Sequence, residues 1–98
     1  MVLLKEEKKM ETLPYIQEII DDVKIRTFDE NVDDEELKWH RDREDRIVEV
    51  MEGNYWYLQM DNELPKPLIV GEKYFIPEGV YHRVIKGVGN LKVKIKKG

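Results

Sequence analysis

The 98-residue sequence contains no cysteine. A disulfide framework and a site built on a thiolate are therefore both excluded. Folding must depend on an apolar core instead, and 41% of the residues are hydrophobic, which is close to the norm for a globular domain. A chain of this length buries well over half of the surface that it exposes when unfolded. We therefore expect one domain with a modest core.

The sequence also lacks any hydrophobic run long enough for a secretion signal or a membrane span. Four apolar residues at positions 1–4 are followed at once by charged residues. A signal peptide needs an apolar region of about 7–15 residues, and a transmembrane helix needs about 20. We expect a cytoplasmic protein that does not enter a membrane.

A large excess of one charge is missing as well. Charged residues make up 39% of the chain, yet the net charge is only -4. Disordered chains usually combine few hydrophobic residues with a large net charge, so a folded domain is expected. The C-terminal residues 83–98 hold six basic residues and no acidic one. Because these lysines alternate along one expected strand, they should form its solvent face, and nucleic-acid binding is not expected.

One stretch near the N-terminus has helical periodicity. Its apolar residues recur at a spacing that places them on one helix face: Leu13, Ile16, Ile19, Ile20 and Val23. Thr12 can cap such a helix, and Pro14 suits its first turn. The pattern predicts an α-helix over residues 12–22, at the end of an N-terminal segment of residues 1–22. Its apolar stripe should pack on the domain or on a partner chain.

From residue 23 onward the apolar residues recur with a period of two. This period predicts strands over residues 23–28, 37–42, 46–52, 55–60, 66–70, 73–76, 81–86 and 91–96. In the last of them Leu91, Val93 and Ile95 alternate with lysines, which predicts one buried face and one wet face. About eight short strands with tight turns predict an all-β fold, either a barrel or a double-sheet jelly roll, over residues 23–98.

The stretch GEKYFIPEGVYH, at residues 71–82, combines a glycine turn, a proline bend, a second glycine and a histidine that begins a strand. Its pattern G-x5-P-x-G-x2-H resembles the second motif of the cupin family. Residues 37–53, LKWHRDREDRIVEVMEG, resemble the first motif in part, through the opening WH and the ending VEVMEG. Asp42 stands where that motif usually has a second histidine, and Arg46 stands where it usually has a glutamate.

The resemblance implies a small jelly-roll barrel, also described as a double-stranded β-helix, preceded here by the predicted helix. Cupins commonly hold one divalent metal ion, such as iron, manganese, nickel or zinc, between histidines and a carboxylate. By position, His40 and His82 would be metal ligands and Asp42 a changed ligand. Arg46 cannot be a ligand, because a guanidinium stays protonated. Dimers are frequent in such proteins, so a homodimer is a candidate assembly.

The residues themselves lead to a similar site. His40 and Asp42 lie two positions apart on an expected strand and should face the same side. A closed barrel can bring His82 beside them from another strand. Two imidazoles and one carboxylate make a facial triad with open positions, which suits non-haem iron(II).

A small-molecule ligand would complete this site. Arg46 offers a bidentate fork that can neutralise a carboxylate or a phosphate on the ligand. Tyr57 and Gln59 are candidate polar contacts, provided that they share the inward face with Arg46 and Val48. The sequence assigns no catalytic residue.

Three alternatives stay open. In the first, an ion pair between Arg46 and Asp42 replaces the metal, and the protein is a non-catalytic binding or structural module. In the second, the order H-x-D…H resembles the metal motif of 2-oxoglutarate-dependent oxygenases, which share a double-stranded β-helix. In the third, the protein is an interaction subunit that works through its N-terminal helix.

Overall fold

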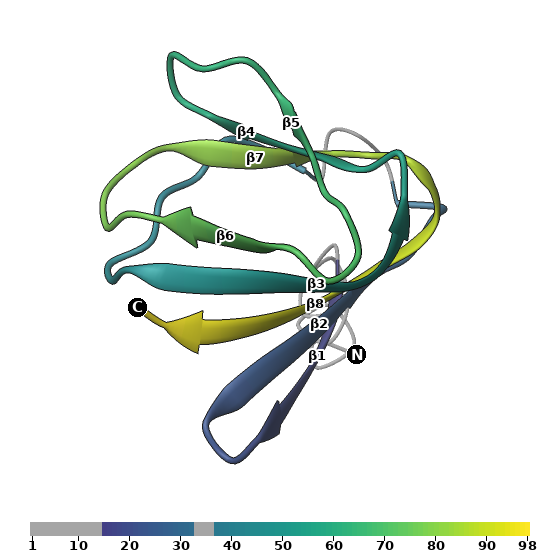
Figure 1. The fold of residues 1–98 in the computed structure, drawn as a ribbon, viewed down its shortest axis with the longest axis horizontal. Coiled ribbons are helices and arrows are strands. Elements are labelled where there is room, and N and C mark those ends of the chain that lie inside the picture. The colour runs from purple at the N-terminus through teal and green to yellow at the C-terminus, as the bar shows by residue number, and fades with distance from the viewer. Residues whose placement is uncertain (1–14, 33–36) are drawn as a thin grey trace, which may run out of the picture.

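The computed structural model of the protein describes residues 15–32 and 37–98. These residues form eight strands: β1 (Tyr15–Ile20), β2 (Val23–Phe28), β3 (Arg46–Asn54), β4 (Tyr57–Met60), β5 (Lys66–Pro67), β6 (Lys73–Ile76), β7 (His82–Ile85) and β8 (Val88–Lys97). One antiparallel sheet has the order β1-β2-β8-β3-β6, and a smaller one has the order β5-β4-β7 (Figure 1). The all-β prediction is confirmed. The described part of the chain has no helix, and hence none that could cross a membrane.

The predicted helix over residues 12–22 is wrong wherever the structure describes it. All six residues of β1 pair with β2, and the connection is formed by Asp21 and Asp22, with φ of 51° and 66°. Positive φ at both central residues is the geometry of a tight hairpin turn, and aspartate tolerates it. The isoleucines that suggested a helix are β-branched, so they suit a strand better. Residues 12–14 lie outside the described residues.

The strand predicted over residues 37–42 is also wrong. In its place the structure has a single bridge, in which the backbones of His40 and His82 exchange two hydrogen bonds of 2.9 and 2.8 Å. Two residues later the chain leaves this pairing, and the carbonyl of Asp42 accepts a hydrogen bond from the backbone N–H of Gly79. The segment is therefore an irregular connection whose backbone is bonded to Gly79 and to His82. The other predicted strands are present, with β3 and β8 longer and β4, β5 and β7 shorter than predicted.

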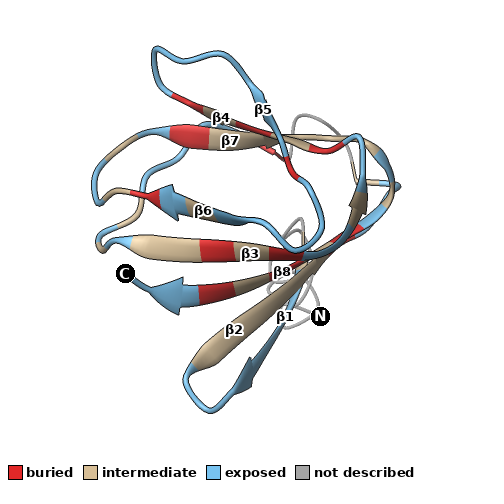
Figure 2. Cartoon of the chain, in the orientation of Figure 1, coloured by how far each residue is buried: buried red, intermediate tan, exposed pale blue. Residues whose placement is uncertain are grey.

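The core lies between the two sheets, and its buried residues lie on strands of both (Figure 2). The most deeply buried side chains are Trp56, Leu91 and Val50. The alternation predicted for β8 is confirmed, because Leu91, Val93 and Ile95 are buried whereas the lysines between them are not. Burial on a period of two thus fixes which face of β8 points inward.

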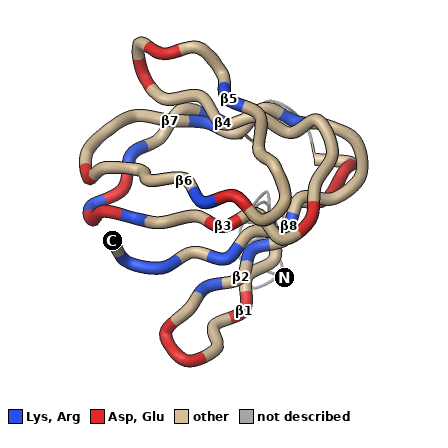
Figure 3. Tube along the Cα trace, in the orientation of Figure 1, with Lys and Arg blue, Asp and Glu red and all other residues tan. Residues whose placement is uncertain are grey.

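The lysines of β8 have acidic neighbours on the outer face of the larger sheet. Lys92 lies opposite Glu52 of β3, and Lys94 lies opposite Glu49 (Figure 3). Opposite charges at directly paired positions stabilise a sheet modestly. This arrangement agrees with the solvent face predicted for the lysines of β8.

Candidate metal centre and ligand cavity

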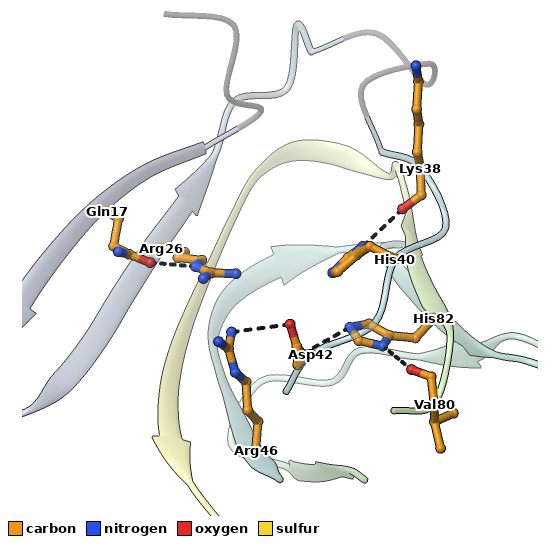
Figure 4. A network of polar contacts seen from close by, with 8 residues as sticks. All are labelled: Gln17, Arg26, Lys38, His40, Asp42, Arg46, Val80 and His82. Atoms are coloured by element: carbon orange, nitrogen blue, oxygen red, sulfur yellow. Dashed lines mark hydrogen bonds and ion pairs between the residues drawn. The ribbon is translucent and has the colours of Figure 1, made fainter. Parts of the chain in front are cut away.

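A cavity of about 270 Å³ lies between the two sheets. Most of its lining is apolar and comes from the inward residues of both sheets, such as Phe28, Leu58 and Val93. The polar residues that line it are Arg26, Lys38, His40, Asp42, Arg46 and His82. Lys38 contributes its backbone, since its ammonium points away from the other labelled side chains (Figure 4). A mostly apolar pocket with a few convergent polar groups is the usual form of a small-molecule site.

The structure brings His40, Asp42 and His82 together on one side of the cavity. One ligand atom from each of them lies within 4.8 Å of the others, so the group could hold a metal ion. The two imidazole rings meet edge to face with 4.3 Å between their centroids. His82 Nε2 lies 3.4 Å from Asp42 Oδ2. The backbone bridge between the two histidines holds this geometry, although the predicted strand around His40 is absent.

Hydrogen bonds fix the orientation of both rings. His40 Nδ1 donates to the carbonyl of Lys38 at 3.0 Å, and His82 Nδ1 donates to the carbonyl of Val80 at 2.9 Å. A carbonyl oxygen only accepts, so Nδ1 must carry the hydrogen in each ring. In the neutral ring, Nε2 then keeps a free lone pair. Two such nitrogens beside a carboxylate fit a divalent metal ion, since metal-bound histidines commonly have this second hydrogen bond.

Burial keeps His82 in the form that can bind a metal. The residue is only 4% exposed. Desolvation lowers the pKa of His82 below its usual value, because burial penalises the charged imidazolium. The charges of His40 and Arg46 lower this pKa further, while the hydrogen bond to Val80 and the charge of Asp42 act in the opposite direction.

Arg46, the first residue of β3, lies beside the group. Its Nη1 is 3.7 Å from Asp42 Oδ1, and both side chains are largely buried. This distance makes an ion pair but is too long for a good hydrogen bond. The contact uses one oxygen of Asp42, while the other faces His82 (Figure 4). The ion pair and a metal ligand role for Asp42 are therefore geometrically compatible.

Arg26 also lines the cavity, although it was not among the site residues predicted from the sequence. Its Nε donates to Gln17 Oε1 at 2.6 Å, and its guanidinium carbon lies 4.3 Å from the ring centroid of Tyr15. Desolvation lowers the pKa of Arg26, although a guanidinium remains protonated at any physiological pH. One signal could have found it: Arg26 lies two residues before Phe28, so both share the inward face of β2.

Tyr57 and Gln59 do not line the cavity, so the inward face expected for them is wrong. On β4 it is Leu58 and Met60 that are buried, and Leu58 lines the cavity. Gln59 is bound elsewhere, because its Oε1 accepts a hydrogen bond of 2.9 Å from Nε of Arg83. A shift of one residue in register places a strand residue on the opposite face.

The chain matches no family model and no curated protein at a significant level. Solved structures are similar to it. A cupin domain from Bordetella pertussis Tohama I is 25% identical, over 86% of this chain and 93% of that one, with a TM-score of 0.60. A cupin-2 domain-containing protein from Shewanella frigidimarina NCIMB 400 is 19% identical, over 94% and 88%, with a TM-score of 0.60.

A third similar structure is that of Fe(II) HppE in complex with substrate, at 19% identity and a TM-score of 0.60. The match covers 83% of this chain but only 51% of that one, so the chain spans about half the length of HppE. The chain has the fold of a small cupin, as the resemblance of its second motif predicted.

Proposed function

We propose that the protein binds one divalent metal ion and a small anionic ligand in the cavity between its sheets. The observation that carries this proposal is the arrangement of three donor atoms within 4.8 Å, in a cavity with apolar walls. His40 and His82 would each bind through Nε2, and Asp42 through its carboxylate. Iron, manganese, nickel and zinc are the candidate metals, and the set of two histidines and one carboxylate favours iron(II). A bound ion would supply a Lewis acid that polarises an oxygen of the ligand.

The other residues of the site bind and orient the ligand. Arg46 adds a positive charge beside the metal group and can form two parallel hydrogen bonds with a carboxylate or a phosphate. The apolar walls lower the local dielectric constant, which strengthens electrostatic contacts inside the cavity. The similar structure of HppE is that of its iron(II) form in complex with substrate, which agrees with a metal-dependent small-molecule site on this fold.

Metal content tests the proposal. Protein without a histidine tag is stripped of metal, loaded with iron(II), manganese, nickel or zinc, and analysed by elemental mass spectrometry. We expect one equivalent in the wild type and less than about a tenth in His82→Ala, because loss of one of three ligands removes most of the affinity. His40→Ala serves as a second variant, because His40 is exposed and its loss should spare the fold.

A matched control is Arg83→Gln. Arg83 follows His82 on β7, does not line the cavity and binds Gln59 instead. This variant should load like the wild type. Wild-type protein that retains less than about a tenth of an equivalent of every metal would contradict the proposal.

The ion pair of 3.7 Å between Arg46 and Asp42 favours a second candidate function. In that case the pair neutralises the site without metal, and the protein is a non-catalytic module that binds a small polar ligand. A buried pair of this kind is tolerated when its remaining hydrogen-bonding groups are satisfied. The second candidate predicts ligand binding that is equally strong in metal-free and metal-loaded protein.

A further inference from the structure

Arg26 is held in the cavity wall by neutral partners only. Its Nε donates a hydrogen bond to Gln17 Oε1 at 2.6 Å, and its guanidinium carbon lies 4.3 Å from the ring centroid of Tyr15. Within residues 15–32 and 37–98, the ion pairs found involve other residues, so Arg26 forms none there, and the charge of Asp42 acts on it only from a greater distance. Among the described residues only its Nε forms a side-chain hydrogen bond, and the guanidinium points toward the side where His40 lies (Figure 4).

The position of Arg26 in β2 is one where an apolar side chain would suit the core. On the same inward face, Phe28 is buried, and the cross-strand neighbour on β8 is the buried Val93. A charged group that is partly removed from water without a counterion reduces the stability of the folded state. Such a charge in a cavity is typical of a site that binds an opposite charge.

The charges around the cavity do not cancel. Arg26 and Arg46 contribute two positive charges and Asp42 contributes one negative charge, so one positive charge is left when both histidines are neutral. A divalent ion on the metal group would raise this excess to three. The remaining walls are apolar, and the volume of about 270 Å³ is roughly that of nine water molecules. A fitting ligand is therefore small, with an anionic head and a short apolar body.

We infer that Arg26 binds the anionic head group of the ligand, and that the ligand is a small amphipathic acid with a carboxylate, phosphonate or phosphate head. The free Nη groups of Arg26 donate to two oxygens of this head, in the geometry that planar guanidinium groups form with oxyanions. Gln17 and Tyr15 are positioning residues, because they hold the guanidinium in place. The inference deepens the proposed function by naming the ligand class, and it rests on that function only for a metal in the same cavity.

The test uses full-length, metal-loaded protein and four probes that share one body: butanoate, butylphosphonate, 1-butanol and butylammonium. Calorimetric titration should show binding of one or both acids, and binding of the alcohol and the amine at least about tenfold weaker. A stronger signal from butanoate or from butylphosphonate distinguishes a carboxylate head from a tetrahedral one. Failure of both acids to bind, or equal binding of the alcohol, would overturn the inference.

Arg26→Gln should weaken binding of the preferred acid by about 10–100-fold, because hydrogen bonds to charged groups contribute about 1.5–3 kcal/mol. Arg26→Met is a second neutral variant whose apolar side chain suits the core face, in case the glutamine variant unfolds. Arg26→Lys should restore part of the affinity through its charge but not the bidentate contact. Wild-type affinity in both neutral variants would overturn the inference.

Arg83→Gln is again the matched control, because Arg83 has the same kind of support outside the cavity. Its Nε donates to Gln59 at 2.9 Å, and its guanidinium lies 5.0 Å from the ring of Trp39. This variant should bind the acid like the wild type, and an equal loss in both variants would overturn the inference.

Metal content is measured on every sample, so that the two proposals fail separately. If the wild type holds no metal but binds the acid, and Arg26→Gln loses this binding, the proposed function is contradicted and the role of Arg26 is supported. If the wild type holds metal and Arg26→Gln binds the acid equally well, the proposed function is supported and the role of Arg26 is contradicted.

Discussion

The two walls of the cavity each carry an arginine, and they differ in what holds it. On the motif wall, formed by residues 40–46 and His82, Arg46 lies 3.7 Å from Asp42. On the hairpin wall, formed by β1 and β2, Arg26 is held by the neutral side chains of Gln17 and Tyr15. The motif wall thus contains its own counterion, whereas the hairpin wall leaves a positive charge facing the cavity. This difference fits metal binding on one wall and recognition of an anion on the other.

The largest expected effect comes from removing the counterion of the motif wall. Asp42→Asn keeps the size of the side chain but removes the charge that faces both Arg46 and His82. We expect metal affinity to fall at least about 100-fold, since even changes outside the ligand set cost 10–100-fold. Competition with a coloured chelator measures this affinity.

Glu44→Gln is the matched control, because Glu44 forms its ion pair with Lys97 on the surface. It should leave metal affinity unchanged. Asp42→Asn protein that binds metal as tightly as the wild type would contradict the assignment of the motif wall.

A smaller effect should separate the two arginines. Arg46→Gln removes a positive charge beside Asp42, so we expect metal affinity to rise about tenfold, after allowance for solvent screening of the Coulomb energy. Arg26 lies on β2, which β8 separates from β3, and it forms no ion pair with Asp42, so Arg26→Gln should raise the metal affinity less. The same chelator competition measures both variants. Equal changes in the two variants, or weaker binding in Arg46→Gln, would remove the difference between the walls.

The pH dependence of stability tests whether His82, the buried metal-ligand candidate of the motif wall, is neutral in the folded protein. Burial lowers the pKa of His82, so the unfolded chain binds this proton more readily than the folded protein. Above a pH of about 6.5, the pKa of histidine in the unfolded chain, His82 is neutral in both states and does not reduce the free energy of unfolding. As the pH falls from there to the lower pKa of His82 in the folded state, the free energy of unfolding decreases by at most about 1.4 kcal/mol for each pH unit.

Urea unfolding of metal-free protein on both sides of this pH measures the loss. In His82→Gln the corresponding part of the pH dependence should vanish. Identical slopes of the free energy of unfolding against pH in the two proteins would show that His82 does not titrate in this way.

The smallest expected effect concerns the turn of the hairpin wall. Asp21 and Asp22 both have positive φ, where asparagine and glycine are favoured in two-residue hairpins. The double variant Asp21→Asn, Asp22→Gly should raise the free energy of unfolding by about 0.5–1 kcal/mol, because it relieves left-handed strain. A helix at this position would instead be destabilised by about 1 kcal/mol by the glycine. Thermal unfolding distinguishes the two signs.

The strand predictions were most accurate where apolar and charged residues alternate, because the apolar positions are then the buried ones. In β8 the apolar residues and the lysines alternate without a break, so the inward face followed from the pattern. At β1 the same kind of reasoning failed, because Ile16, Ile19 and Ile20 are exposed and occupy both faces of an edge strand. Without one buried face, their spacing was compatible with a helix.

The motif wall was predictable because its geometry is local to two short patterns. The backbone bridge between His40 and His82 brings these patterns together, and Asp42 follows two residues later. The hairpin wall was not predictable in this way. The contact between Arg26 and Gln17 depends on the register of β1 with β2, and the cavity position of Arg26 depends on the pairing of β2 with β8. Such non-local registers are not encoded in the spacing of residues within one strand.

Metal binding by His40, Asp42 and His82 is tested by titrating metal-free, untagged protein with cobalt(II) and following the visible spectrum. Cobalt(II) suits the same nitrogen and oxygen ligands as iron(II), and its spectrum reports its coordination. We expect a band that saturates at one equivalent, is lost in His40→Ala, and changes on addition of the preferred acid in the wild type but not in Arg26→Gln. A wild-type protein that shows only the spectrum of aqueous cobalt(II) would contradict metal binding by these residues.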